Sequence, residues 1–138
     1  MIRTKLQTFN GIEVESPSVS FGLSIYWLKG ADSDRMRETI EQVLMDASKK
    51  GLRPIGKYYR FNNMLNILFR GNDVNRFAEF LFEQDVSNFL IDLIYQNEDG
   101  EVMSVEISKD KNKTIIPKTL KDSQTIKSRW LNWFNQYQ

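Results

Sequence analysis

The stretch SVSFGLSIYWL, residues 18–28, alternates more strictly than any other part of the chain. Large apolar side chains stand at every odd position from 19 to 27, and serine or glycine stands at positions 18, 20, 22 and 24. A period of two sends successive side chains to opposite faces of a strand. Residues 18–28 therefore predict a β-strand with one face for the core and one small-residue face that a further layer can approach closely.

A helical pattern begins directly after this strand. Apolar side chains recur at positions 36, 40, 43, 44 and 47, and Asp32, Ser33 or Asp34 is expected to be the N-cap residue. Gly51 suits the end of this helix, where a left-handed residue is common. The remaining patterns predict a hairpin at residues 5–15 with its turn at 10–11, strands at 55–61 and 64–70, a helix with its apolar stripe at 74–82, and strands at 88–96 and 102–107.

The order of these elements indicates the fold class. From residue 18 to residue 95 it is β-α-β-β-α-β, the order of the ferredoxin-like fold, in which two helices cover one face of an antiparallel sheet. The amino-terminal hairpin and the strand at 102–107 are expected to extend the sheet. We expect one α+β domain over residues 1–138, with a body at 1–107, a basic linker at 108–119 and an amphipathic helix at 120–138.

Composition sets the limits for this expectation. The chain has 138 residues, of which 41% are hydrophobic and 27% charged, as is usual for a globular domain. It contains no cysteine and no apolar run of membrane-spanning length, which favours a cytoplasmic protein. Residues 1–107 hold 12 basic and 16 acidic side chains, a balance of −4, whereas residues 108–138 hold 7 and 2, a balance of +5.

The usual catalytic residue types are missing. The chain has no histidine and no cysteine, and it contains no phosphate-binding glycine loop. Asp32 and Asp34 are better explained as helix-capping residues than as magnesium ligands. The acidic residues at 98, 99 and 101 suit a hairpin turn and lack the full calcium-loop pattern. We therefore expect no enzyme, no catalytic residue, no cofactor and no metal site.

The basic tail is the first candidate binding site. Its lysines are followed by two tryptophans in the predicted final helix, so the segment combines positive charge with stacking surface for phosphate or an acidic protein. The favoured alternative is that Trp130, Phe134 and Ile126 pack on the open sheet face while the lysines stay in water. A third alternative is that the aromatic stripe packs on a second copy and forms a homodimer. The candidate residues are Lys111, Lys113, Lys118, Lys121, Lys127, Arg129, Trp130 and Trp133.

A second candidate site lies on the strand at 55–61. Lys57, Tyr58, Tyr59 and Arg60 interleave aromatic and basic side chains, and in topology the domain resembles the RNA-recognition module, which stacks bases on its sheet. The Gly-Phe-Gly-Phe-like motif of that module is absent from residues 64–70. The alternative is that one of the two tyrosines belongs to the core and the other lies on the surface.

Together these observations favour a function through binding. We expect a non-catalytic protein that binds another protein, as an inhibitor, immunity or accessory factor does. A nucleic-acid-binding module that uses the tail lysines with Trp130 and Trp133 is the first alternative, and a structural subunit of a larger assembly is the second.

Overall fold

The protein has an α+β fold in which helices cover both faces of a six-stranded sheet. The structure is a computed structural model that describes residues 4–7, 13–61, 63–107, 118–119 and 124–137. The described helices are α1 (Ser33–Lys49), α2 (Asp73–Glu83) and α3 (Gln124–Gln136). The described strands are β1 (Thr4–Gln7), β2 (Glu13–Ser16), β3 (Ser20–Trp27), β4 (Tyr59–Phe61), β5 (Met64–Arg70), β6 (Phe89–Gln96), β7 (Val102–Ile107) and β8 (Lys118–Thr119).

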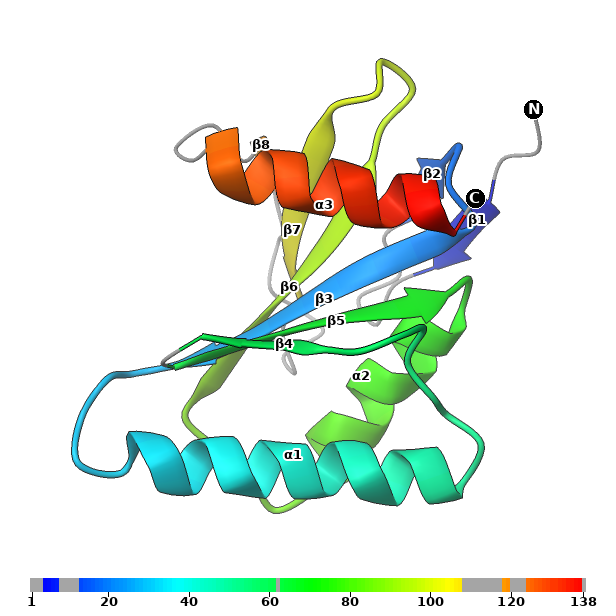
Figure 1. Ribbon diagram of the computed structural model, residues 1–138. Coiled ribbons are helices and arrows are strands. Elements are labelled where there is room, and N and C mark those ends of the chain that lie inside the picture. Colours follow the sequence, from blue (N-terminus) through cyan, green and yellow to red (C-terminus); the bar gives the residue numbers. More distant parts are fainter. Residues whose placement is uncertain (1–3, 8–12, 62, 108–117, 120–123, 138) are drawn as a thin grey trace.

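The main sheet is antiparallel throughout and has the strand order β4-β5-β3-β6-β7-β8. From β3 to β6 the elements follow in the predicted order β-α-β-β-α-β. Figure 1 shows α1 and α2 below the sheet and α3 above it. The sheet is thus the middle one of three layers, and each of its faces has its own set of packed side chains.

The alternation in residues 18–28 is confirmed by the packing of β3. Its large side chains, Phe21, Leu23, Ile25 and Trp27, are buried in the main core with residues of α1 and α2. Its small residues Ser20, Gly22 and Ser24 lie on the opposite face and are also buried, and Gly22 contacts Trp130 of α3. β3 has β5 on one side and β6 on the other, so it is the strand around which the domain is built.

The two predicted helices of the body are present. The apolar positions of α1 at 40, 43, 44 and 47 and those of α2 at 74, 77, 78, 81 and 82 are buried. Asp32 occupies the N-cap position of α1, but its side chain makes no capping hydrogen bond. Gly51 follows α1 with a φ of 91°, a left-handed angle that favours glycine.

The amino-terminal hairpin does not extend the main sheet, so this prediction is wrong. β1 and β2 form a separate two-stranded sheet, which adds Leu6 and Val14 to the main core. The reason lies in the connection to β3, which spans only residues 17–19. Because β3 is paired on both sides, a hairpin that enters it directly finds no neighbouring edge to pair with. The predicted turn at residues 10–11 lies outside the described residues.

Two further boundaries differ from the prediction. The strand expected at 55–61 is limited to Tyr59–Phe61, because Gly56 has a φ of 65° and interrupts the extended backbone. Residues 118–119, which fall in the predicted linker, form β8 and pair with β7. The rest of the expected linker up to residue 117 lies outside the described residues, whereas β7 extends the sheet as predicted.

Candidate functional site

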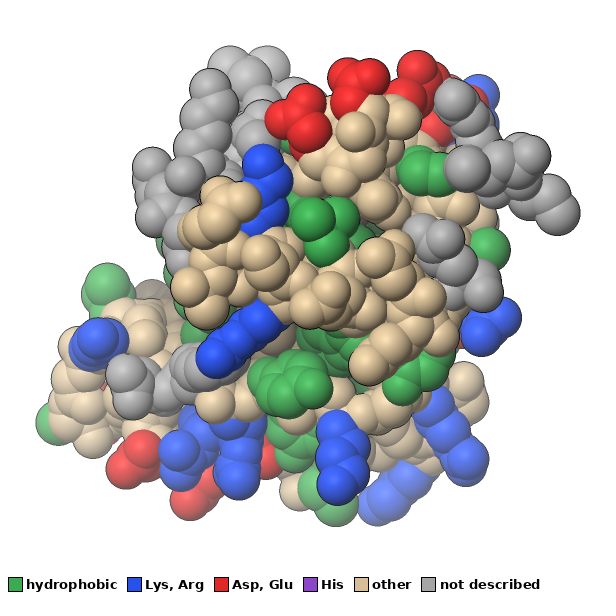
Figure 2. Space-filling model, turned by 45° about the horizontal axis from the view of Figure 1, so that its top comes forward, with side chains coloured by type: hydrophobic (Ala, Val, Ile, Leu, Met, Phe, Trp, Pro, Cys, Tyr) green, Lys and Arg blue, Asp and Glu red, His purple; other side chains and the backbone are tan. Residues whose placement is uncertain are grey.

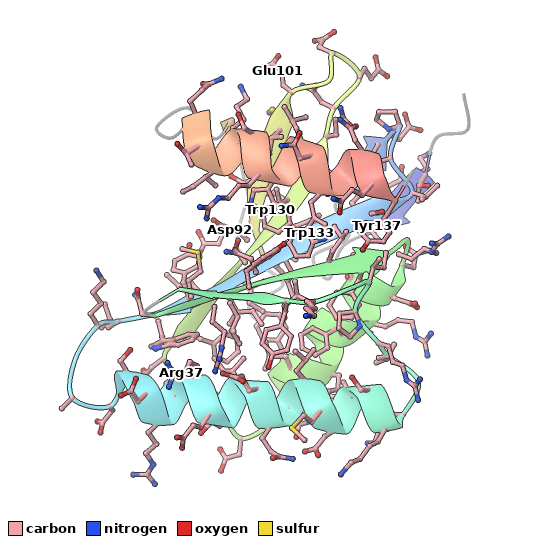
Figure 3. The ribbon with its side chains drawn as sticks, viewed as in Figure 1. Arg37, Asp92, Glu101, Trp130, Trp133 and Tyr137 are labelled. Carbon is pink, nitrogen blue, oxygen red and sulfur yellow. The ribbon has the colours of Figure 1, made fainter. Side chains whose placement is uncertain are left out.

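The docking of α3 defines the candidate site, because α3 covers only part of its sheet face. Trp130 lies directly on Gly22, where an added Cβ would stand 2.2 Å from the Trp130 ring. Trp133 stacks on Trp130 with 5.1 Å between the ring centroids, and Phe134 is fully buried. Figure 3 shows both tryptophans on the sheet side of α3. The absence of a side chain at Gly22 therefore leaves the space in which the Trp130 ring of α3 packs on β3.

The side chains below α3 form a second core, separate from the main one. Its sheet residues are Leu68, Ile94 and Val102. Leu68 and Ile94 are the register partners of Gly22 on its two sides, so this core occupies the cross-strand row at Gly22. At the end of α3, Ser20 Oγ donates a hydrogen bond of 3.4 Å to the carbonyl oxygen of Tyr137.

The same face continues beyond the second core toward the Trp27 end of β3. Figure 1 shows the sheet descending away from α3 in that direction. Side chains on one face of a strand are two residues apart, so the pairing registers place two more cross-strand rows there. We call the residues of these two rows the strip. They are Tyr59, Asn66, Ser24, Asp92 and Glu106 in the first row, and Met64, Tyr26 and Leu90 in the second.

The strip holds two carboxylates close to a tyrosine hydroxyl. Tyr26 donates a hydrogen bond of 3.4 Å to Asp92 Oδ1, and Glu106 is the register partner of Asp92 on β7. Burial raises the pKa of Tyr26 to about 12, with further contributions from the negative charges of Asp92 and Glu106. The Tyr26 hydroxyl therefore stays protonated at neutral pH.

Large side chains are exposed at both ends of the strip. Tyr59, on the edge strand β4, is 54% exposed although its ring meets the edge of Trp133 with 5.1 Å between centroids. Leu90, on β6, is 49% exposed. Between them, Ser24 Oγ donates a hydrogen bond of 2.5 Å to Asn66 Oδ1. The strip thus combines exposed apolar surface with polar groups that are already held in place.

The residues of the predicted tail site are only partly described. Lys111, Lys113 and Lys121 lie outside the described residues. Lys118 lies in β8, where it is the register partner of Ser104. The prediction that these lysines form one basic surface therefore lies outside the described residues.

The remaining tail residues divide between surface and core. Arg129 is exposed and Lys127 is half-buried, whereas Trp130 and Trp133 are 3% and 8% exposed. The tryptophan rings are packed on the sheet, as in the favoured alternative, and do not present a stacking surface. Ile126 departs from that alternative because it lies in the first turn of α3 and is 46% exposed.

The second predicted site is split by the alternation of its strand. Tyr58 packs against the main core, and Tyr59 points to the other face and contacts α3. Arg60 is exposed and its guanidinium lies 3.3 Å from Glu41 on α1, while Lys57 is exposed. The alternative of one core tyrosine and one surface tyrosine is confirmed.

Glu41 is a structural residue that the sequence reasoning missed. Its carboxylate accepts a hydrogen bond of 2.8 Å from the Tyr58 hydroxyl and lies 3.6 Å from Arg37 and 3.3 Å from Arg60. Burial raises the pKa of Tyr58, and the hydrogen bond to Glu41 adds to the effect. These contacts connect α1 to the edge of the sheet, and Figure 3 shows Arg37 on the sheet side of α1.

The acidic turn between β6 and β7 has the contacts of a hairpin turn. Asn97 Oδ1 accepts hydrogen bonds from the backbone N–H groups of Asp99 and Glu101, at 3.0 and 2.8 Å, and Gly100 has a φ of 81°. This is the local bonding that favours asparagine in turns. In the view of Figure 2, acidic side chains gather at the top and basic side chains lie along the lower part.

The described residues hold neither a cluster of metal-binding side chains nor a helix that could span a membrane. Across those residues, histidine, cysteine, aspartate and glutamate side chains nowhere gather in a group of three or more that could hold a metal ion. Within the same part of the chain, every helix is too short or too polar to cross a membrane.

The strip itself was not predicted, although one signal for it was present. Residues 88–96 carry apolar side chains on both faces, with Asp92 as the single charged residue in the middle. A carboxylate inside such a strand indicates a part of the face that is not packed into a core. Its neighbours across the sheet could not be named, because they depend on the pairing register.

Comparisons with known proteins give no match at a significant level, whether with protein-family models, with curated proteins or with solved structures.

Proposed function

We propose that this protein is a non-catalytic binding protein that acts on another protein, as an inhibitor, immunity or accessory factor. The strip is the observation that carries the proposal. It presents Tyr59 and Leu90 at the surface, with Tyr26 and Met64 half-buried between them. Tyrosine and methionine are enriched in protein–protein interfaces, where a few large anchors supply most of the binding energy.

The chemistry of the strip supports binding over catalysis. A general acid or base works best when its pKa is near the working pH, and the pKa of Tyr26 is raised to about 12. The chain also contains neither histidine nor cysteine, the residue types most used for proton transfer and for nucleophilic attack.

The nucleic-acid alternative receives less support. Binding of nucleic acid gains most of its affinity from cations that face phosphates, whereas the strip contains Asp92 and Glu106. The rings that would stack on bases belong to Trp130 and Trp133, and both are buried between α3 and the sheet. A structural subunit would also use the strip, but it would keep it covered in a permanent assembly.

We also propose that the segment from β3 to β6 is a ferredoxin-like domain. The strand order β4-β5-β3-β6, the antiparallel pairing and the two helices on one face support this proposal. The fold leaves the opposite sheet face for additions or for partners, and here α3 uses part of it.

The proposal is tested with two variants that place a charge at equally exposed positions. Leu90→Lys changes the strip, and Met45→Lys changes the outer surface of α1, where Met45 is 56% exposed. The wild-type chain and both variants are used as bait in nuclease-treated extract of the source organism. Captured proteins are identified by mass spectrometry, and the best candidate is purified and titrated against each bait.

The expected result is one protein that binds the wild-type chain and Met45→Lys directly and binds Leu90→Lys at least about tenfold more weakly. Equal binding to all three baits would contradict the role of the strip. Capture of nucleic acid alone, lost as salt rises, would instead support the nucleic-acid alternative. If no protein binds directly, the proposal of a protein partner is wrong.

A further inference from the structure

The main sheet separates two groups of packed side chains, and α3 belongs to only one of them. The described buried side chains of the main core all lie between Leu6 and Ile107, so α3 contributes none of them. The second core joins the aromatic side chains of α3 to the sheet residues Leu68, Ile94 and Val102. α3 also supplies no strand to the main sheet. The sheet and the main core therefore keep their own contacts when α3 leaves the surface.

The sequence of α3 gives it little stability as a separate helix. It has 13 residues, and isolated helices shorter than about 12–15 residues are marginal in water even when they are rich in alanine. Its strong helix formers are Gln124, Lys127, Arg129, Leu131 and Gln136, and its other residues are β-branched, aromatic, serine or asparagine. Within the described residues of α3, the first turn has no acidic side chain and the last turn no basic one, so charges do not support the helix dipole. The helix therefore depends on its contact with the sheet.

The aromatic contacts that hold α3 on the sheet depend on one another. Trp130 fills the space over Gly22. The rings of Trp133 and Phe134 both pack against the ring of Trp130, with 5.1 and 5.8 Å between centroids. When Trp130 leaves its place, the other two rings lose their packing partner and a cavity opens beside them. These contacts are therefore expected to form and to break together.

We propose that α3 is a conformational switch. It is either docked and helical or undocked and unfolded, while the sheet with α1 and α2 stays folded in both states. Undocking uncovers Leu68, Ile94 and Val102, which are at most 2% exposed while α3 is docked. α3 thereby controls access to this part of the sheet face. The inference does not rest on the proposed function, because it concerns the surface under α3 and not the strip.

Native-state hydrogen exchange of the full chain tests this inference, because it measures local opening amide by amide. Nuclear magnetic resonance follows the hydrogen-bonded amides of α3 and those of β3, β5 and β6 in the wild-type chain and in two variants. Gly22→Ala changes the contact under α3. Ile40→Val removes one methyl group from the main core on the other side of the sheet, where Ile40 of α1 is fully buried.

In the wild-type chain, the α3 amides should share one protection factor, at least about tenfold lower than that of the sheet amides. Ile40→Val destabilises the docked and the undocked state equally relative to the unfolded chain. It should therefore lower the protection of the sheet amides about two- to tenfold and leave that of the α3 amides unchanged. Gly22→Ala should lower the protection of the α3 amides by about fivefold or more, because it weakens docking directly.

Two patterns of exchange would overturn the inference. If the α3 and sheet amides have the same protection and Ile40→Val lowers both equally, α3 opens only when the whole domain unfolds. If the α3 amides respond unequally to Gly22→Ala, α3 does not move as one unit. A Gly22→Ala chain in which only the α3 amides lose all protection supports the switch, whereas one in which the whole domain is unfolded contradicts it, because the sheet should not need α3.

Discussion

The contact between Gly22 and Trp130 leads to the most specific prediction about this fold. In a Gly22→Ala variant, the new Cβ would lie 2.2, 2.6 and 2.9 Å from three atoms of the Trp130 ring. The ring cannot move aside easily, because Trp130 is 3% exposed and its ring packs against those of Trp133 and Phe134. We therefore expect α3 to shift or to detach from the sheet.

The size of the effect follows from two opposing contributions. Overpacking a filled core costs about 1–3 kcal/mol. Replacing a glycine inside a strand by alanine gains about 0.5–1 kcal/mol, because glycine loses more freedom on folding. We expect the free energy of unfolding of Gly22→Ala to fall by about 1–2 kcal/mol, measured by urea unfolding with tryptophan fluorescence and circular dichroism.

A matched control and a second background make the test specific. Gly30→Ala adds the same methyl group where no atom lies within 4 Å, so it should change stability by less than about 0.5 kcal/mol. Trp130→Ala should itself cost about 3–5 kcal/mol, because it empties the second core. In that background Gly22→Ala should be neutral or stabilising, because the ring it meets is gone. If Gly22→Ala costs the same with and without Trp130, the steric explanation is refuted.

Two further predictions concern polar contacts. Glu41→Gln should lower the free energy of unfolding by about 1 kcal/mol, because it removes the charge that faces Arg37 and Arg60. Glu38→Gln, at an exposed position of the same helix, is the control. If urea titrations show that Glu38→Gln lowers the free energy of unfolding by as much, this role of Glu41 is contradicted. The pKa of Tyr26 is about 12 in the folded protein, against an ordinary value of 10.0. The protonated Tyr26 hydroxyl therefore makes its full contribution to the free energy of unfolding below pH 10, and this contribution is lost as the pH rises toward 12. Between pH 9 and pH 11.5 the free energy of unfolding of the wild-type chain should fall by on the order of 1 kcal/mol relative to that of Tyr26→Phe. This value is smaller than the full pKa shift would give, because Tyr26 is only half-buried. A constant difference between the two proteins across this range would show that the Tyr26 pKa is not raised.

The strands and helices of the body could be predicted because their buried apolar residues recur at regular spacings along the chain. The period-two pattern at residues 18–28 and the helical stripe at residues 36–47 each state which side chains face the core. The boundaries that failed depend on single backbone angles or on distant neighbours. The left-handed angle at Gly56 shortened one strand, and the occupied sides of β3 excluded the hairpin from the sheet.

The candidate site could be predicted only in part. The sequence named Trp130 and Trp133 as the notable side chains of the last helix, and it offered both a packed and an exposed role for them. The packed role was decided by Gly22, which lies more than a hundred residues earlier in the chain and leaves the space that the ring fills. No local sequence pattern predicts the contact between Gly22 and Trp130, because it forms only when α3 docks on the sheet.

By itself, the sequence determined the class of the fold, the faces of its main strand and the absence of histidine and cysteine. Those properties are local, since each depends on residue type and on spacing within about twenty positions. The tertiary structure alone decided which side chains became the strip. The register of the three antiparallel strands β3, β6 and β7 brought Tyr26, Asp92 and Glu106 into neighbouring rows, and the position of α3 left those rows beside the second core. Register and docking are set by the sum of many long-range contacts, which a one-dimensional pattern does not contain.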